Sequence, residues 1–414
     1  MSGAGTLLDA ARHGKPDVVE LALLGTYGDY SSDDLNLALV KAAIEGSVEC
    51  VELLLDYGAD INATDVDGDT ALIMAGSNGH EKVVKCLLDR GCMVSIIGSS
   101  DLSVLHRAAW DGMISVVKLL LQSDKKQVKE LLEAKEMFGD TPLMLACAQG
   151  HLEVTDVLIK AGSDLFARNQ DEEMAIHHAA KKGHTEVIKH LHDAGVDLNI
   201  VSAWGYTPIL YAAMNNQIEA LKYIVNNGAD INTACHAKKT ALHYAAAKGC
   251  DEMVRFLIDA GAETEVYDVH GKTPLFDAVY QSHPNATKLL IKAGANVNIK
   301  GQAFFDGVQK VSLFYVAIWK GNTEIIQDVY KAGAGIIDVF KEIMLCEKIK
   351  LHLKKSPEVQ GMLEHLATHP MTLKEICRLK IRTSCAQNRV TRVTKIKSLS
   401  LPISLQQYLL FSDF

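Results

Sequence analysis

Two short patterns in this 414-residue chain have residue types that could bind a metal ion or a phosphate group. Asp65-Val66-Asp67-Gly68-Asp69 has the alternating carboxylates of a calcium loop, but its Gly comes too early and no Glu closes the frame. Gly271-Lys272-Thr273 ends like a phosphate-binding loop, but Val266 stands where that motif needs its leading Gly. The sequence therefore favours ordinary turns at both places, and it predicts neither a metal nor a cofactor.

Histidine and cysteine could serve as catalytic groups, and both are frequent here. The histidines recur near the start of predicted helices or directly after a Gly, which indicates hydrogen-bonding turn residues: His80, His106, His151, His177, His178, His184 and His243. The nine cysteines form no CxxC pair and no zinc-finger spacing, and no motif marks one of them as a nucleophile. We therefore expect reduced core thiols and no catalytic activity in the chain itself.

The elements that carry these residues repeat with one period. Thr207, Thr240 and Thr273 are 33 residues apart, and four steps of 33 lead from Gly162 to Gly294. Two longer intervals locate insertions of five residues near 123–135 and of six near 301–309, which loops absorb easily. Two independent markers with the same period predict an all-α solenoid of helix–turn–helix repeats joined by hairpin loops.

Local signals explain why each period folds as a pair of helices. In Gly139-Asp140-Thr141-Pro142-Leu143, a turn with Gly leads to a Thr cap and to Pro at the first helical position. Small residues such as Ala245 and Ala246 then let neighbouring first helices approach closely. Second helices such as 153–160 carry apolar side chains at helical spacing and end at a Gly that supplies a left-handed cap.

Charge is distributed unevenly along the chain. From Met371 onward there are eight Lys or Arg and two Asp or Glu, a net +6 that leaves −15 on the rest of a chain whose formal net charge is −9. The acidic body argues against nucleic acid as a partner. The sequence begins without a basic-then-apolar signal and contains no apolar run long enough to cross a bilayer, so we expect a cytoplasmic or nuclear protein without membrane contact.

The repeat unit resembles the ankyrin family. Thr240-Ala241-Leu242-His243-Tyr244-Ala245-Ala246 and Gly150-His151-Leu152-Glu153-Val154 match that family's signature. The resemblance runs from about Thr6 to Gly335 and implies nine or ten repeats. It implies a degenerate N-terminal capping repeat over residues 1–31 and ankyrin repeats over 32–335, with Met174 in place of one capping Thr.

After Gly335 the period stops, and residues 336–369 are predicted to form a helical cap or connector. Thr372-Leu373-Lys374-Glu375 is a capping box that opens a helix with Leu373, Cys377 and Ile381 along one side. Such a side can fill a groove on a partner. The apolar end of the chain is costly to leave in water, so we expect it to pack on the preceding helix and on a further surface.

Residues 370–414 resemble the suppressor-of-cytokine-signalling box (SOCS box). The resemblance implies that Leu373, Cys377 and Ile381 bind elongin C. It also implies that a downstream motif faces cullin-five, through Leu401, Pro402, Ile403 and Leu405. Ser400 stands where this motif usually has its first Pro, and because Ser does not preset an extended backbone, the departure weakens the expected cullin contact.

Together the two resemblances imply a substrate-recognition adaptor of a cullin-RING E3 ubiquitin ligase. Such an adaptor is not an enzyme. Its repeats hold a target protein and its SOCS box binds elongin B/elongin C and cullin-five with the RING partner, so that the target is ubiquitinated and degraded by the proteasome. The alternative is an ankyrin scaffold or inhibitor without a ligase link, whose C-terminal helices only cap the repeats.

The surface expected to bind the unknown protein substrate is formed by first helices and turns. The residue two positions before the inter-helix Gly is not needed for the core, and we expect large exposed side chains at this position, or at the related position of a repeat that lacks the Gly, to act as anchors: Trp110, Met214, Tyr280 and Trp319. Further candidates lie at a turn and in the second insertion: Trp204, Phe304 and Phe305. The alternative is that these side chains pack on the loops of their own repeats.

Overall fold

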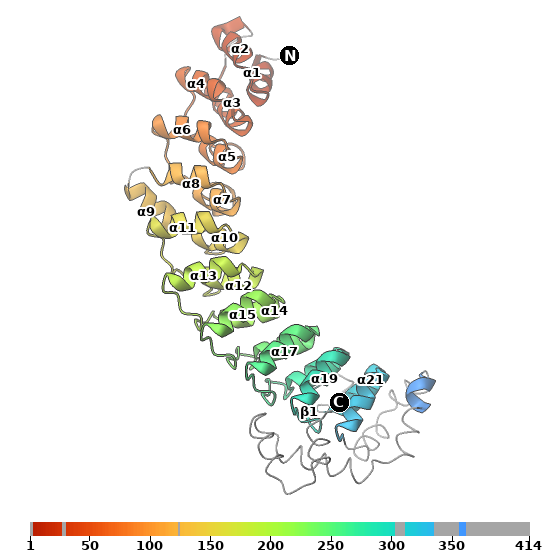
Figure 1. The fold of residues 1–414 in the computed structure, drawn as a ribbon. Helices are drawn as coiled ribbons and strands as arrows, with labels where there is room; N and C mark the ends of the chain where they lie inside the picture. Colours follow the sequence, from red (N-terminus) through yellow and green to blue (C-terminus); the bar gives the residue numbers. More distant parts are fainter. Residues whose placement is uncertain (1–2, 27–29, 123–124, 303–310, 335–355, 362–414) are drawn as a thin grey trace. The chain divides into compact units, whose positions relative to one another are not determined.

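A computed structural model of the chain describes residues 3–26, 30–122, 125–302, 311–334 and 356–361. The chain divides into two compact units, Met1–Ala203 and Trp204–Phe414, called here the first and the second unit. In both units the described residues fold as consecutive pairs of antiparallel helices, each with a first and a second helix (Figure 1). The predicted all-α repeat architecture is confirmed.

The first unit contains six helix pairs among its described residues. They are α1 (Gly3–Arg12) with α2 (Pro16–Leu21), α3 (Ser32–Glu45) with α4 (Val48–Asp56), α5 (Ala71–Ser77) with α6 (Glu81–Asp89), α7 (Val104–Trp110) with α8 (Ile114–Leu120), α10 (Pro142–Gln149) with α11 (Leu152–Lys160), and α12 (Ala175–Lys182) with α13 (Thr185–Asp193). A π-helical turn, η1 (Ala22–Thr26), follows α2, and a 3₁₀ turn, η2 (Ser99–Asp101), precedes α7.

The second unit contains four helix pairs among its described residues. They are α14 (Pro208–Met214) with α15 (Ile218–Asn226), α16 (Ala241–Lys248) with α17 (Asp251–Asp259), α18 (Pro274–Tyr280) with α19 (Pro284–Lys292), and α20 (Leu313–Lys320) with α21 (Thr323–Lys331). Two short strands, β1 (Lys300–Gly301) and β2 (Val311–Ser312), pair antiparallel at the second insertion, with Lys300 opposite Ser312.

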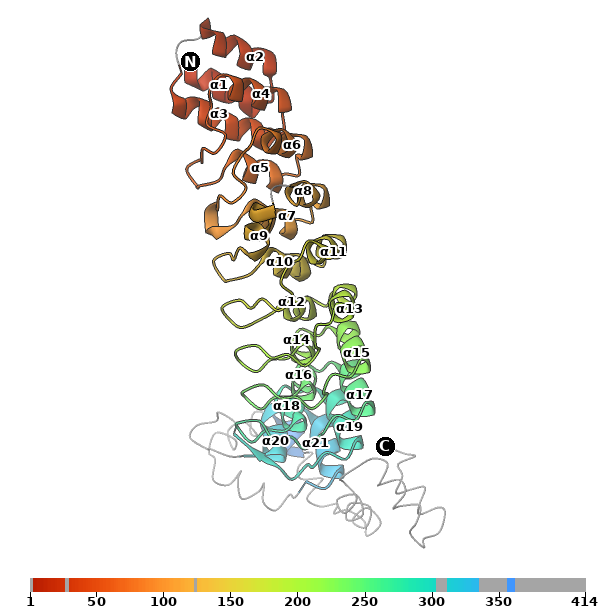
Figure 2. The same ribbon diagram turned by 90° about the vertical axis from the view of Figure 1, so that its left-hand side faces the viewer.

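The core of each unit lies between two layers of helices. First helices pack side by side in one layer, as α10 does with α7 and α12, and second helices form the other layer, as α17 does with α15 and α19 (Figure 2). The small residues of the first helices allow this close packing, because Ala179, Ala180, Ala245 and Ala246 are fully buried. Leu191, from a second helix, is fully buried in the same way.

The two patterns that resemble ligand loops are turns and helix caps. Asp65 Oδ1 accepts hydrogen bonds from the backbone N–H groups of Asp67 and Asp69, both at 3.0 Å, so this carboxylate closes its own turn. Thr273 Oγ1 accepts a hydrogen bond from the Phe276 N–H at 3.3 Å and caps the N-terminus of α18. Both structural interpretations made from the sequence are confirmed.

Backbone hydrogen bonds link the tips of successive turns in a ladder. In the first unit, Gln170 N–H donates to Phe138 O at 3.1 Å and Ala203 N–H donates to Asp171 O at 2.9 Å. In the second unit the same bond recurs from His236 to Trp204 at 3.0 Å, from Val269 to Ala237 at 3.1 Å, and from Gln302 to His270 at 2.9 Å. Since each bond joins equivalent positions, the ladder holds the turns of a unit in a regular row.

The first insertion differs from the expected loop. Its residues form α9 (Lys125–Glu133), a helix that packs on α10. Leu131 and Leu132 are buried, at 1% and 5% exposure, while the lysines on the opposite side are exposed. The sequence Lys-Lys-Gln-Val-Lys-Glu-Leu-Leu-Glu is amphipathic, so burial of the two leucines stabilises a helix in place of the expected loop.

Candidate functional site

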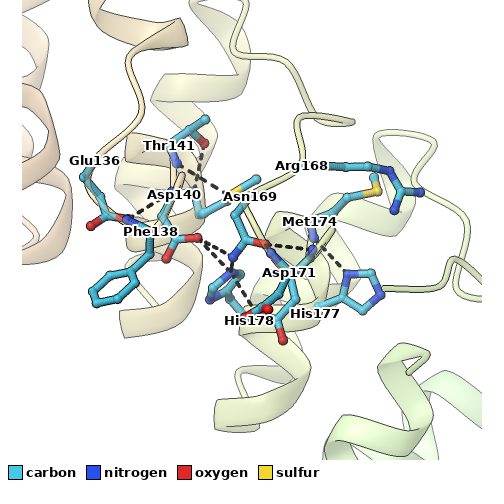
Figure 3. A network of polar contacts seen from close by, with 12 residues as sticks. Glu136, Phe138, Asp140, Thr141, Arg168, Asn169, Asp171, Met174, His177 and His178 are labelled. Atoms are coloured by element: carbon cyan, nitrogen blue, oxygen red, sulfur yellow. Dashed lines mark hydrogen bonds and ion pairs between the residues drawn. The ribbon is translucent and has the colours of Figure 1, made fainter. Parts of the chain in front are cut away.

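A polar network joins the turns of two neighbouring repeats in the first unit, centred on Asn169 (Figure 3). The Asn169 side-chain oxygen accepts hydrogen bonds from the backbone N–H groups of Asp171 at 3.0 Å and Glu173 at 2.8 Å. Its Nδ2 group donates to Asp140 Oδ1, in the preceding turn, at 2.7 Å. One amide side chain therefore shapes its own turn and attaches it to the turn before it.

His178 on α12 completes this network from the helix side. Its Nε2 atom lies 3.3 Å from Asp140 Oδ1 and 3.4 Å from Glu173 Oε2, with only 12% of the side chain exposed. Burial acts to raise the pKa of Asp140, but the hydrogen bond and the charge of His178, together with the Asn169 bond, outweigh it and lower that pKa below its ordinary value. All the contacts named here are made within the protein, which is typical of a structural network.

The pair of positions occupied by Asp140 and His178 recurs between other neighbouring repeats with different chemistry. At these junctions the residue before one helix cap contacts the residue four positions after the cap of the next repeat. Asp69 and Arg107 form an ion pair at 2.9 Å, Tyr206 and Tyr244 bring their hydroxyls within 3.2 Å, and Lys239 and Asp277 form an ion pair at 2.9 Å. We call these contacts the junction pairs.

The periodic histidines bond to the backbone of neighbouring repeats. His106, His177 and His243 place Nε2 at 3.1–3.2 Å from the carbonyl oxygens of Asp140, Ile200 and Lys272. A second set contacts the carbonyls at the ends of preceding first helices at 2.8–3.0 Å: His80, His151, His184 and His283. The repeated histidines make the predicted hydrogen bonds, although His106, His177 and His243 lie inside first helices and not in turns.

Burial also sets the protonation of the first set. Desolvation lowers the pKa of His106 and of His177 to about 4, although backbone acceptors act in the opposite direction. The same cause lowers the pKa of His243. These imidazoles are neutral at neutral pH and have no exposure to solvent, so they hold repeats together.

Four of the six described cysteines are core residues, whereas Cys86 and Cys250 are half-buried. Cys50, Cys92, Cys147 and Cys235 are buried and unpaired. Burial raises the pKa of the Cys92 and Cys147 thiols to about 12, so neither is a thiolate at neutral pH. The prediction of core thiols is confirmed for these four residues, while Cys346, Cys377 and Cys385 lie outside the described residues.

The predicted anchor residues that the structure describes differ in exposure. Trp110 at the end of α7 is 48% exposed and Trp204 at a turn tip is 62% exposed. Met214, Tyr280 and Trp319 are half-buried, so the equivalent repeat position is less open than expected in the second unit. Phe304 and Phe305 lie outside the described residues.

Lysine side chains account for part of that burial around Tyr280. The Lys272 and Lys320 Nζ atoms lie 4.7 and 4.6 Å from the centroid of the Tyr280 ring, within the range of a cation–π contact. Lys320 also lies 5.5 Å from the Trp319 ring. Two neighbouring repeats thus contribute aromatic rings and ammonium groups to one surface.

Comparison with known families decides the assignment of the repeats. The family model for ankyrin repeats matches residues 7–98, 105–200, 157–235 and 233–301, well over half of the chain. The chain belongs to the ankyrin-repeat family. Ankyrin repeats are non-catalytic modules, and they point to protein binding in general.

The C-terminal segment of this ankyrin-repeat protein matches a second family. The SOCS-box model matches residues 369–410, which confirms the predicted combination of modules in one chain. A SOCS box is a non-catalytic module that points to elongin B/C and cullin binding in general. The residues proposed from the sequence for these contacts lie outside the described part of the structure: Leu373, Cys377, Ile381, Leu401, Pro402, Ile403 and Leu405.

A curated relative of the ankyrin-repeat protein is named dynein axonemal heavy chain 12, from Bos taurus. It is 30% identical over 82 residues, which are 19% of this chain and 22% of that protein. The chain thus matches about a fifth of the length of this relative. The similarity is to a short segment.

Sequence reasoning missed three features of this ankyrin surface. The first is the set of apolar side chains at exposed turn tips, which includes Val66 at 97% exposure, Met137 at 50% and Val269 at 52%. The second is the pair of lysines on Tyr280, and the third is the set of junction pairs. Aligning the repeats at the capping residue would have revealed the first and third, because each set occupies a constant position relative to the cap.

Two kinds of site are not seen in the part of the ankyrin-repeat protein that the structure describes. There, no three or more His, Cys, Asp or Glu side chains are arranged to hold a metal ion. None of the helices in the same residues combines the length and apolar character needed to span a membrane.

Proposed function

We propose that this ankyrin-repeat protein is the substrate-recognition adaptor of an elongin B/C, cullin-five and RING ubiquitin ligase in the cytoplasm or nucleus. Residues 1–31 form the N-terminal capping repeat, 32–335 the substrate-binding repeats, 336–369 a connector and 370–414 the SOCS box. The adaptor forms and breaks no bond. It raises the local concentration of substrate lysines beside the charged ubiquitin-conjugating enzyme, and the substrate is ubiquitinated and then degraded.

The observation that supports this proposal is the presence of both family matches in one chain, repeats over 7–301 and a SOCS box over 369–410. A binding solenoid and a ligase-docking module are the two parts that an adaptor needs. The chemistry of the described repeats fits this role, because the buried histidines and cysteines are held in structural contacts.

The roles of the C-terminal residues follow from their spacing. Leu373, Cys377 and Ile381 fall along one side of a predicted helix, and we assign them to a groove on elongin C. Leu401, Pro402, Ile403 and Leu405 are assigned to cullin-five. Pro402 restricts the backbone of that segment, whereas Ser400 does not.

For the substrate surface we assign the large side chains of the turns and first helices. Trp110 and Trp204 are the most exposed of the described candidates and are suited to insert into a partner. Met214, Tyr280 and Trp319 form the half-buried part of the surface, and Phe304 and Phe305 of the second insertion are also assigned to it.

Co-purification tests the ligase link. The full chain is co-expressed with elongins B and C and isolated through an affinity tag on the chain. The unmodified chain is expected to recover both elongins in stoichiometric amounts, and the double variant Leu373→Asp, Cys377→Asp is expected to reduce their recovery at least tenfold. Leu152→Asp is the matched control, because Leu152 lies on α11 and is already 38% exposed.

A chain that recovers no elongin in any of these forms is a scaffold or inhibitor and not a ligase adaptor. Equal recovery by the unmodified chain and the double variant, with both chains folded by circular dichroism, shows that Leu373 and Cys377 are not the contact residues.

A further inference from the structure

The turn and first-helix side of the second unit is basic. Over the turn tips and first helices, residues 204–214, 235–248, 268–280, 300–302 and 311–320, there are six lysines: Lys238, Lys239, Lys248, Lys272, Lys300 and Lys320. The two carboxylates on this side, Asp268 and Asp277, are each 5% exposed and both lie near Lys239, at 3.7 and 2.9 Å. The second helices show no such surplus, since α15, α17, α19 and α21 together carry six acidic and five basic residues.

Two of these lysines are concentrated on one aromatic ring. Lys272, in the turn before α18, and Lys320, at the end of α20, both reach the ring of Tyr280 at the end of α18. Lys272 also lies 5.8 Å from the Phe276 ring, and Lys320 lies near Trp319. Cationic and aromatic groups therefore alternate over a small area.

Neither ammonium has a carboxylate within 4.0 Å among the residues that the structure describes, in contrast to Lys239. The negative face of the Tyr280 ring attracts both charges but does not neutralise them, and the two like charges repel each other. An anionic group of a partner beside either ammonium gains a favourable charge contact. An apolar side chain beside it can pack on the Tyr280 and Trp319 rings.

We propose that this surface recognises an acidic segment of a protein substrate, in which Asp or Glu side chains flank an apolar residue. The carboxylates bind Lys272 and Lys320, and the apolar residue packs against Tyr280 and Trp319. The inference rests on the proposed function, because it names the class of substrate that the adaptor takes.

The charge of the first unit favours a protein segment over a nucleic acid. In the turns and first helices over 65–77, 98–110, 136–149 and 169–182 there are nine acidic and three basic residues. That surface repels a long phosphate backbone. A short acidic peptide needs only the area around Tyr280.

Fluorescence anisotropy with the full chain tests the proposal. The probe is a fluorescein-labelled twelve-residue peptide of Glu and Asp around a central Leu-Tyr, and the matched peptide has Gln and Asn in place of the acids. We expect the acidic peptide to bind at least tenfold more tightly than the matched peptide. The double variant Lys272→Gln, Lys320→Gln should weaken that binding at least tenfold.

The double variant Lys292→Gln, Lys331→Gln is the control, because both residues are exposed on second helices of the same unit and their loss removes the same two positive charges. It should change binding by less than twofold. Equal affinity for the two peptides, or equal weakening by the control variant, overturns the proposal. Tighter binding of a single-stranded oligonucleotide of equal charge, lost in the same double variant, replaces it with a nucleic-acid site.

Elongin recovery from the same preparations separates this inference from the proposed function. Recovery of elongins without selective binding of the acidic peptide overturns the inference and leaves the adaptor role in place. Selective peptide binding without elongin recovery overturns the adaptor role and leaves acidic-segment recognition as the property of a scaffold.

Discussion

At the scale of single residues, polar groups hold the repeats together while they remain uncharged or internally paired. His106 and His177 are neutral rings that bond to the next repeat, and Lys239 is an ammonium between two buried carboxylates. The contacts of these groups stabilise the folded chain only when each group has the right protonation state or the right partner. Their contributions can therefore be measured by changing the pH or the partner.

The buried histidines predict a loss of stability in mild acid. The pKa of each of His106 and His177 is about 4 in the folded chain, and it is about 6.5 in an unfolded one. Because only the unfolded state binds these protons readily, stability is full above about pH 6.5 and falls as the pH drops toward about 4. The expected loss is on the order of 3 kcal/mol for each histidine.

Urea unfolding of the chain at several values of pH measures this effect. The double variant His106→Gln, His177→Gln lacks both titrating groups and should show a shallower dependence over the same window. Equal pH dependence of the variant and the unmodified chain would contradict the assignment.

The Lys239 junction pair predicts coupling between two neighbouring repeats. Lys239→Met leaves the carboxylates of Asp277 and Asp268 buried without a cation, which should cost about 2 kcal/mol of stability. Adding Asp277→Asn should recover about 1 kcal/mol of that loss, because one of the stranded charges is removed. Urea unfolding of both single variants and the double variant gives the coupling energy.

A surface pair supplies the comparison for this cycle. Lys222 and Glu252 lie 2.9 Å apart, but 71% of the Glu252 side chain is exposed, so Lys222→Met should leave the unfolding midpoint unchanged. If Lys239→Met also leaves the unfolding midpoint unchanged, the junction pair contributes no stability.

At the scale of elements, each helix pair is closed by residues that the next pair contacts. Gly150 ends α10 in a left-handed conformation, with φ at 80°, and the imidazole of His184 packs directly over it. Gly162 after α11 has φ at 95°, and no atom lies within 4 Å of the position of a β-carbon. Two glycines with similar backbone angles thus differ in their surroundings, because only the first lies under a neighbouring repeat.

These two glycines predict different costs for the same substitution. Gly162→Ala should destabilise the chain by about 1–2 kcal/mol, the cost of the backbone conformation alone. Gly150→Ala should cost at least about 2 kcal/mol more, since His184 must move and lose its 3.0 Å contact with Ala148 O. Thermal unfolding of both variants measures the difference, and equal midpoints would show that the imidazole moves freely.

At the scale of the whole molecule, the repeat fold can be predicted from local sequence signals. The contacts that form between stacked repeats cannot. Thr141, Pro142 and Gly150 mark their own helix directly, so the period and the helix pairs could be found from the sequence. Lys320 meets Tyr280 only because two repeats stack, and no local pattern marks that contact. The interval between repeats gives only the length of the first insertion, so it does not predict the α9 helix, which depends on the spacing of its leucines.

In the proposed function the repeats bind the substrate and the SOCS box binds the ligase, which predicts how a truncated chain behaves in cells. Removal of residues 370–414 should leave substrate binding intact but prevent ubiquitination, so severalfold more substrate should be recovered with the truncated chain. A proteasome inhibitor should bring recovery by the two chains to the same level, because degradation is then blocked for both. Quantitative mass spectrometry of the captured proteins checks this outcome, which a scaffold without a ligase link does not produce.

The junction pairs also bear on how a tandem array keeps its length over generations. Recombination between similar repeats can delete residues 207–239 without disturbing the reading frame or any remaining helix pair. The shortened array would place Tyr206 at the position of Lys239, and Asp277 would meet a phenol in place of an ammonium group. The junction pairs differ in chemistry, so loss of one repeat creates a mismatched pair and lowers the stability of the shortened protein. Loss of a repeat from an array of identical repeats would create no such mismatch.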